Sequence, residues 1–135
     1  MQNIISFSET QKRQLLEHAE KESPNESCAI LYGKIKEDIA IVIEIYFTKN
    51  IDESPINFTI SNEELIKAYK VAEEKRLDIV GIFHSHPDSL PAPSSTDKKF
   101  MQTNPVVWVI YSGSTKEFKA YTLDESIKEV TIQTS

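Results

Sequence analysis

The chain has 135 residues, which suits one compact domain and is short for two. Hydrophobic residues make up 39% of the chain and charged residues 27%, an ordinary balance for a globular protein and too apolar for a disordered one. The formal net charge of -6 gives a surface that repels phosphate backbones and anionic lipid headgroups. We therefore expect neither a nucleic acid nor a membrane as a partner.

The single cysteine, Cys28, excludes an internal disulfide and a cysteine-rich metal site. Residues 1–7 lack the basic start and the long apolar run of a secretory signal. The most apolar stretch, residues 39–47, contains Glu44 and is far too short to span a membrane. Together these features predict a cytoplasmic protein.

The first part of the chain predicts a helix followed by two strands. Ser8 and Gln11 have the spacing of a capping box, and the helix that they begin runs to about Ser23, because Pro24 cannot continue it. Two strand-like runs, joined by a polar turn, lie at residues 27–36 and 38–47. A loop and a short extended piece are expected at residues 49–57 and 58–60.

The second part continues the alternation of helices and strands. Ser61 and Glu64 have capping-box spacing, and an apolar stripe follows at helical spacing. That stripe consists of Leu65, Ala68, Tyr69 and Ala72. The later predicted strands are residues 78–85, 106–111, 117–123 and 127–132, with a proline-rich loop and a short helix from about Ser94 to Pro105 after the first of them. Because strands and helices interleave, we expect one mixed α/β domain over residues 1–135, with a sheet flanked by helices.

Two histidines at the end of a predicted strand suggest metal chemistry. His84 and His86 are two residues apart, so they share one face of the strand, with Cα atoms about 6.5–7 Å apart, while Ser85 points to the other face. The proline loop could fold Asp97, in the first turn of the next helix, back over the strand end. Two nitrogens and one carboxylate oxygen suit Zn²⁺ and leave a fourth position for water, as in catalytic sites.

Each part of this pattern also has a simpler interpretation. Histidines at a strand end are often core-edge residues, and Ser94-x-x-Asp97 is the spacing of a helix capping box. The joint spacing favours the metal site: with 3 His, 14 Ser and 6 Asp in the chain, chance matches to H-x-H-x₇-S-x₂-D number on the order of 3 in 10,000. The two interpretations of Ser94 can coexist, because a capping serine can still present its hydroxyl to the site.

The residues from His84 to Asp97, H-S-H-P-x₆-S-x₂-D, resemble the signature of the JAMM (MPN-plus) metalloproteases. The upstream segment from Pro24 to Gly33 is similar to the family's P-x-E-x-C-G-x-L-x-G and departs from it at Ala29. The order of predicted elements also matches that family along the whole chain. The resemblance implies an MPN-type fold of compact prokaryotic type, with helices layered on a mixed sheet as in cytidine deaminases.

The resemblance also implies a role for each residue of the signature. His84, His86 and Asp97 would hold one zinc ion per chain. Glu26 would accept a proton from the activated water and pass it to the leaving amine, and Ser94 would hydrogen-bond the water or the oxyanion. Spacing alone does not single out Glu26 among the fifteen glutamates.

The implied function is a zinc-dependent peptidase or isopeptidase that cleaves amide bonds after the C-terminal diglycine of a ubiquitin-like or sulfur-carrier β-grasp protein. An edge strand beside the metal could bind the extended tail by β-augmentation. The alternative is an inactive MPN scaffold that only binds partners. A zinc nucleoside deaminase is excluded, because it needs H-x-E and P-C-x-x-C and this chain has one cysteine. The substrate's identity is left open, as is a homodimer.

Three further residues have ordinary interpretations. Cys28 is expected to be a small buried strand residue and His18 a core-edge or surface histidine. Trp108 is either a core residue or part of a substrate platform, and the sequence does not separate these.

Overall fold

A computed structural model describes residues 2–55 and 60–135. Its helices are α1 (Glu9–Glu22), α2 (Asn62–Glu74) and α3 (Ser95–Thr103). Its strands are β1 (Ile4–Phe7), β2 (Cys28–Lys36), β3 (Ile39–Thr48), β4 (Asp78–His86), β5 (Val107–Ser112), β6 (Phe118–Leu123) and β7 (Ile127–Thr134). The extended piece expected at residues 58–60 lies mostly outside the described residues. None of the described helices is long and apolar enough to cross a membrane.

The predicted helix starts are found in the structure. Ser8 caps α1 with a complete capping box, in which Gln11 N donates to Ser8 Oγ and Ser8 N donates to Gln11 Oε1. Ser61 caps α2 by accepting a hydrogen bond from Glu64 N. These bonds satisfy N–H groups that the first turn of a helix leaves without a backbone partner.

One position of the predicted apolar stripe on α2 is wrong. Ala68 and Ala72 are buried against Ile30 and Tyr32 of β2, but the side chain of Tyr69 is 57% exposed. Consecutive residues of a helix point about 100° apart, so Tyr69 lies at the margin of the stripe that Ala68 occupies. A stripe inferred from spacing alone therefore overestimated the buried face of this helix.

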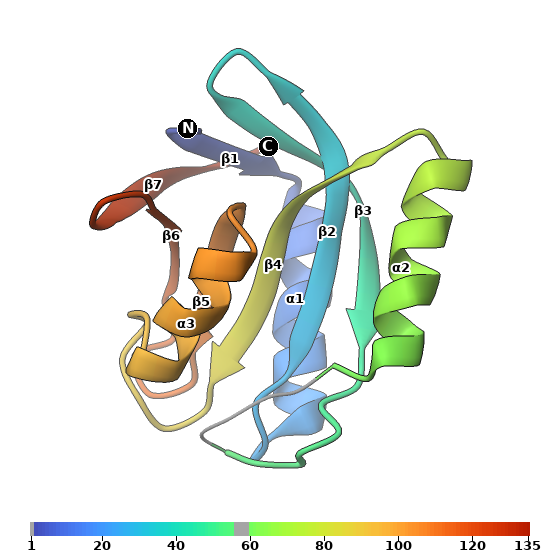
Figure 1. Cartoon of the computed structure of the whole chain (residues 1–135). Coiled ribbons are helices and arrows are strands. Elements are labelled where there is room, and N and C mark those ends of the chain that lie inside the picture. The colour runs from blue at the N-terminus through green and yellow to red at the C-terminus, as the bar shows by residue number, and fades with distance from the viewer. Residues whose placement is uncertain (1, 56–59) are drawn as a thin grey trace.

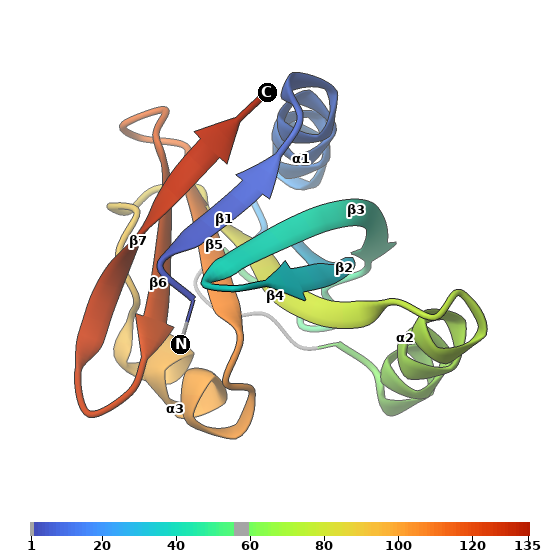
Figure 2. The same ribbon diagram turned by 90° about the horizontal axis from the view of Figure 1, so that it is seen from above.

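The predicted mixed sheet is present, and it closes into a barrel in the order β1-β3-β2-β4-β5-β6-β7. Closure depends on β1, which pairs in parallel with β3 on one side and β7 on the other. Figure 2 shows β1 and β7 running side by side. β1 was not predicted, because four residues are too short to show a strand period and their pairing partners are distant in the chain.

The helices lie on both faces of the sheet. In Figure 1, α1 lies behind β2 and β4, whereas α3 lies in front. Phe83 of β4 packs into the cluster that contains Leu15 of α1, and Ile82 packs with Trp108 and Met101 on the side of α3. Because side chains alternate along a strand, His84 continues on the side of Ile82, toward α3.

The topology brings two other segments, the start of α3 and the residues before β2, to the end of β4. β4 and β5 are parallel and connected through α3, so the start of α3 lies over the end of β4. β2 runs antiparallel to β4 with Cys28 opposite His84. The residues just before β2 therefore lie beside the two histidines, and Ser85 N donates a hydrogen bond to Ser27 O at 3.1 Å.

Candidate metal centre

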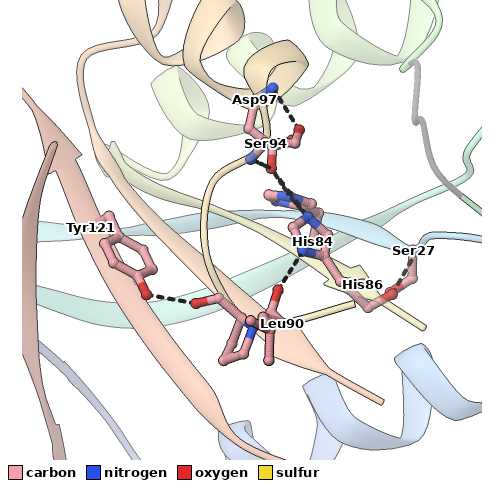
Figure 3. Close-up of polar contacts among 9 residues, drawn as sticks. Ser27, His84, His86, Leu90, Ser94, Asp97 and Tyr121 are labelled. Carbon is pink, nitrogen blue, oxygen red and sulfur yellow. Dashed lines mark hydrogen bonds and ion pairs between the residues drawn. The ribbon is translucent and has the colours of Figure 1, made fainter. Parts of the chain in front are cut away.

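The two histidines at the end of β4 point at one another. His84 is 0% exposed and His86 3%, and their Nε2 atoms are 3.0 Å apart. Ser85 points to the opposite face, as predicted, where its Oγ accepts a hydrogen bond from Ser27 N and contacts Ser27 Oγ, both at 2.9 Å. Figure 3 shows the imidazole rings of His84 and His86 next to Asp97.

Asp97 in the first turn of α3 reaches the same point. Its Oδ2 atom lies 3.1 Å from His84 Nε2 and 3.1 Å from His86 Nε2, and the residue is buried, with 3% exposed. The same oxygen accepts a hydrogen bond of 2.9 Å from Ser94 N, the N-cap residue of α3. The helix cap therefore holds this carboxylate over the strand end.

Glu26 approaches the histidines from the segment before β2. The residue is 3% exposed, and one carboxylate oxygen lies in a group with ring nitrogens of His84 and His86 that are all within 4.8 Å of one another. Its main chain is fixed by the loop after β3: Glu26 N donates to Ser54 O at 2.8 Å, and Asn50 Nδ2 donates to Glu26 O at 3.1 Å. Glu26 Oε1 is buried and accepts no hydrogen bond within residues 2–55 and 60–135.

Burial and hydrogen bonding shift the pKa values of His84, His86 and Asp97 in different directions. Burial lowers the pKa of His84 by more than its hydrogen bond to Asp97 raises it. Burial also acts to lower the pKa of His86, but hydrogen bonds to Asp97 and to the carbonyl of Leu90 outweigh it and raise the pKa. For Asp97, burial acts to raise the pKa, but hydrogen bonds from both histidines hold it well below its ordinary value. A neutral imidazole and an ionised carboxylate are the forms that ligate metals.

The carboxyl group of Glu26 is perturbed in the other direction. Its pKa rises to about 8, chiefly because burial disfavours the charged form. The nearby charge of Asp97 adds to the rise, and the positive charge of His86 opposes it. A carboxyl group with a pKa near neutrality can take up and release protons under ordinary conditions, which is what general acid-base catalysis requires.

The three closest polar atoms fit a divalent metal ion. His84 Nε2, His86 Nε2 and Asp97 Oδ2 are separated pairwise by 3.0–3.1 Å. Ligands of a tetrahedral ion with bonds of about 2.0–2.1 Å lie about 3.3 Å apart, so only small adjustments separate these atoms from such a ligand set. The ring of His86 is also oriented from behind, since its Nδ1 donates to Leu90 O at 2.9 Å, the usual arrangement around a metal-bound histidine.

Either carboxylate could complete a three-residue metal set with the two histidines. Asp97 Oδ2 touches both ring nitrogens at 3.1 Å, whereas the group that contains Glu26 needs separations of up to 4.8 Å. The shorter and equal distances favour Asp97 as the ligand. Glu26 would then lie beside such an ion, with its Oε1 unbonded among the described residues, a position suited to proton transfer rather than ligation.

Ser94 has the capping role that its spacing predicted. Its Oγ accepts a hydrogen bond from Asp97 N at 3.1 Å, which completes the capping box of α3. The bond uses the hydroxyl as an acceptor, and a hydroxyl can still donate its own proton. The structure thus brings His84, His86, Asp97 and Glu26 together, and shows Ser94 acting on Asp97; a contact of Ser94 with a reacting group stays a prediction.

Two contacts that support the site were missed by sequence reasoning. The carbonyl of Leu90 orients His86, and the side chain of Asn50 holds the main chain of Glu26. A main-chain carbonyl carries no residue-type signal, and Asn50 stands among ordinary loop residues. Only the folded chain places either group beside the site.

The remaining predictions concern residues near the site. Cys28 is fully buried, and burial raises the pKa of its thiol to about 12, so it is a packing residue rather than a nucleophile. His18 lies at the core edge, with its Nε2 3.1 Å from Cys28 O. Trp108 is 1% exposed and packs edge-on to His84, with centroids 5.7 Å apart. It is therefore a core residue that supports the site.

The edge strand expected beside the metal is absent from the described part of the chain. β4 pairs with β2 on one side and with β5 on the other, and β2 and β5 are themselves paired on both sides. The prediction was wrong because a linear sequence does not reveal that its sheet closes. Addition of a substrate strand to the sheet is therefore not expected at the end of β4.

Comparison with known proteins identifies the family. A profile of the prokaryotic homologues of the JAB domain matches residues 8–124, which include every residue of the candidate site. The chain belongs to this compact prokaryotic branch of the JAMM (MPN) proteins. The family that the sequence resemblance implied is thereby confirmed.

Three proteins of known name are similar to this chain in sequence. The chain is 39% identical to the desampylase of Pyrococcus furiosus over 103 residues, which cover 76% of this chain and 70% of that protein. It is 28% identical to the desampylase of Haloferax volcanii over 113 residues, 80% of each chain. It is 32% identical over 100 residues to tail tip assembly protein K of Escherichia phage N15, covering 73% of this chain and 37% of that protein.

Solved structures agree with the fold. A protein from Desulfitobacterium hafniense superposes with a TM-score of 0.87 and 29% identity, covering 97% of this chain and 92% of that one. A protein from Salinibacter ruber superposes with a TM-score of 0.71 and 22% identity, covering 100% of this chain and 92% of that one. The α/β fold is therefore shared along essentially the whole chain.

We predict that Asp97→Ala loses the bound metal, because it removes the only carboxylate oxygen in contact with both histidines within the described residues. The measurement is zinc content per chain after purification, by elemental mass spectrometry. Asp88→Ala is the matched control, since Asp88 is exposed in the loop between β4 and α3. Full zinc content in Asp97→Ala would remove Asp97 from the ligand set.

Proposed function

We propose that the protein is a zinc-dependent peptidase or isopeptidase that hydrolyses an amide bond after the C-terminal tail of a ubiquitin-like or sulfur-carrier β-grasp protein. The observation that carries the proposal is the meeting of two Nε2 atoms and Asp97 Oδ2 at 3.0–3.1 Å, with the buried carboxyl group of Glu26 beside them. These groups come from three segments of the chain, and a purely structural role would not require their ligand atoms to converge.

His84, His86 and Asp97 would hold one zinc ion per chain. A zinc ion bound there supplies a water with a pKa of about 7 and polarises the carbonyl group of the substrate. The residues around it provide the rest: burial excludes bulk water from the histidines, and the cap of α3 and the carbonyl of Leu90 fix the orientations of Asp97 and His86.

Glu26 is the proposed proton carrier. Its carboxylate takes the proton of the attacking water and later delivers it to the amine that leaves. Burial raises the pKa of Glu26 toward the range in which both transfers are efficient. The hydrogen bonds from Asn50 and to Ser54 hold its main chain in place, so the side chain approaches the reacting groups from a fixed position.

Ser94 is the proposed hydrogen-bond donor to the oxyanion that develops during the reaction. Its hydroxyl accepts from Asp97 N, so the serine is held at the start of α3 next to the carboxylate ligand. The hydroxyl proton can then be donated to the oxyanion of the tetrahedral intermediate. Loss of one such donor typically costs about 2.7–4 kcal/mol of transition-state stabilisation.

The substrate class rests on family membership and on the relatives, two of which carry the name desampylase. The length of the chain near the site also limits the substrate. Helix α3 has nine residues and a short connection to β5, which leaves little room for a large insertion that would grip a substrate there. We therefore favour a small modifier or sulfur-carrier protein over a large conjugate. An inactive scaffold is the competing function, and it predicts no hydrolysis and no metal dependence.

The proposed function is tested with β-grasp proteins from the same genome, each fused through its C-terminal diglycine to a reporter. We expect cleavage directly after the diglycine, located by mass spectrometry of the products. A strong chelator should abolish cleavage, and added zinc should restore it. A fully active chelated protein would contradict zinc-dependent hydrolysis, and no cleavage of any fusion by zinc-loaded protein would favour the scaffold.

We predict that Glu26→Gln lowers turnover by at least about 100-fold while zinc content and thermal stability stay at wild-type levels, because the amide has nearly the shape of the carboxyl group and cannot take a proton. Initial rates on the cleaved fusion, together with zinc content, provide the measurement. Glu53→Gln is the control, since Glu53 is exposed in the loop that supports Glu26. Wild-type turnover in Glu26→Gln would exclude Glu26 as the proton carrier.

A further inference from the structure

The end of β4 and the loop that follows it are attached at three points to the end of β5 and to β6. Gly113 N donates to His86 O at 2.9 Å, Ser112 Oγ donates to Ser89 O at 2.7 Å, and Tyr121 OH donates to Pro91 O at 2.6 Å. The approach is close, because a Cβ atom at Gly113 would lie 2.4 Å from Pro87 O. The path of this loop is therefore set by β5 and β6, not by the loop alone.

Leu90 in this loop turns its carbonyl group inward and its side chain outward. The side chain is 66% exposed, whereas the carbonyl oxygen accepts hydrogen bonds from Ala92 N at 2.8 Å and from His86 Nδ1 at 2.9 Å. The bond to Ala92 closes a three-residue turn centred on Pro91, whose ring fixes its own φ angle near the value that such a turn needs. The position of this turn determines where the carbonyl of Leu90 points.

The bond between His86 and Leu90 decides which nitrogen of His86 faces the site. Donation from Nδ1 keeps the proton there and leaves Nε2 to act as a ligand. It also fixes the plane of the ring, which matters because Nε2 lies 3.1 Å from Asp97 Oδ2 and 3.0 Å from His84 Nε2. Groups that bond the second nitrogen of a metal-bound histidine typically change metal affinity 10–100-fold when removed.

Tyr121 holds the centre of that turn from β6. Its hydroxyl reaches Pro91 O, the carbonyl next in the chain to Leu90, and Pro91 is itself buried. Tyr121 is also the cross-strand neighbour of Trp108, whose ring packs edge-on to His84. Figure 3 shows Tyr121 and the histidines on opposite sides of the Leu90 turn.

We propose that Tyr121 is a positioning residue for the metal centre: by holding the carbonyl of Pro91, it aims the carbonyl of Leu90 at His86 and so fixes the ring that ligates the metal. The proposal rests on the proposed function, because it concerns the affinity of the same metal site. Tyr121 lies outside the signature, 24 positions beyond Asp97 in the chain.

The competing explanation is that the bond from Tyr121 only stabilises the fold. Tyr32 provides a matched control, because its hydroxyl donates to the main-chain carbonyl of Ala68, also at 2.6 Å and also between a strand and a neighbouring segment. Tyr32 packs with α2, on a part of β2 away from the Leu90 turn. Tyr32→Phe and Tyr121→Phe therefore remove the same kind of bond, and only the second lies behind His86.

The experiment compares zinc affinity in both variants by competition with a chromophoric chelator, with zinc alone as the ligand. We expect Tyr121→Phe to weaken zinc binding about tenfold and Tyr32→Phe to leave it unchanged, even if both lower the melting temperature alike. Equal zinc affinity in wild type and Tyr121→Phe would overturn the proposal.

A second readout is independent of the metal. In metal-free protein labelled with ¹⁵N, the proton on His86 Nδ1 should be protected from exchange by Leu90 O in wild type and in Tyr32→Phe, and exchange faster in Tyr121→Phe. Unchanged protection would overturn the proposal.

If wild type binds no zinc, the proposed function fails, while exchange of the proton on His86 Nδ1 still tests the positioning of His86. Should Tyr121→Phe fail to fold, Pro91→Ala tests the same turn and is expected to show the same two changes.

Discussion

One carboxylate oxygen ties the candidate site together. Asp97 Oδ2 lies 3.1 Å from the Nε2 atoms of both histidines and accepts the main-chain N–H of Ser94. The oxygen therefore belongs at once to a helix cap and to a cluster of ligand atoms. Since the cap is local and the histidines lie on a strand, this contact joins the start of α3 to the end of β4.

The barrel supplies the rigidity that such a cluster needs. β4 is paired on both sides, so the histidines project from a strand whose main chain is bonded by β2 and β5. The segment before β2 brings Glu26 to the same point, and burial raises the pKa of its carboxyl group. A buried carboxyl group costs stability unless it is paired, so its presence here is more readily explained by chemistry than by folding.

The sequence predicted local features well and long-range ones poorly. Capping pairs such as Ser8 and Gln11 were read correctly because both partners lie within one helical turn. The strand β1, the closure of the sheet and the contacts of Leu90 and Tyr121 were missed, because each depends on segments far apart in the chain. Glu26 was found only through the resemblance to a known family, since its neighbours in the sequence do not distinguish it from the other glutamates.

The central claim is that His84, His86 and Asp97 hold one metal ion. It is tested most directly by a crystal structure of the zinc-loaded protein with anomalous data at the zinc edge. We predict a single zinc ion with bonds of about 2.0–2.1 Å to His84 Nε2, His86 Nε2 and an oxygen of Asp97, and no bond to Glu26. A zinc ion ligated by Glu26 in place of Asp97, or bound away from the histidines, would contradict the account.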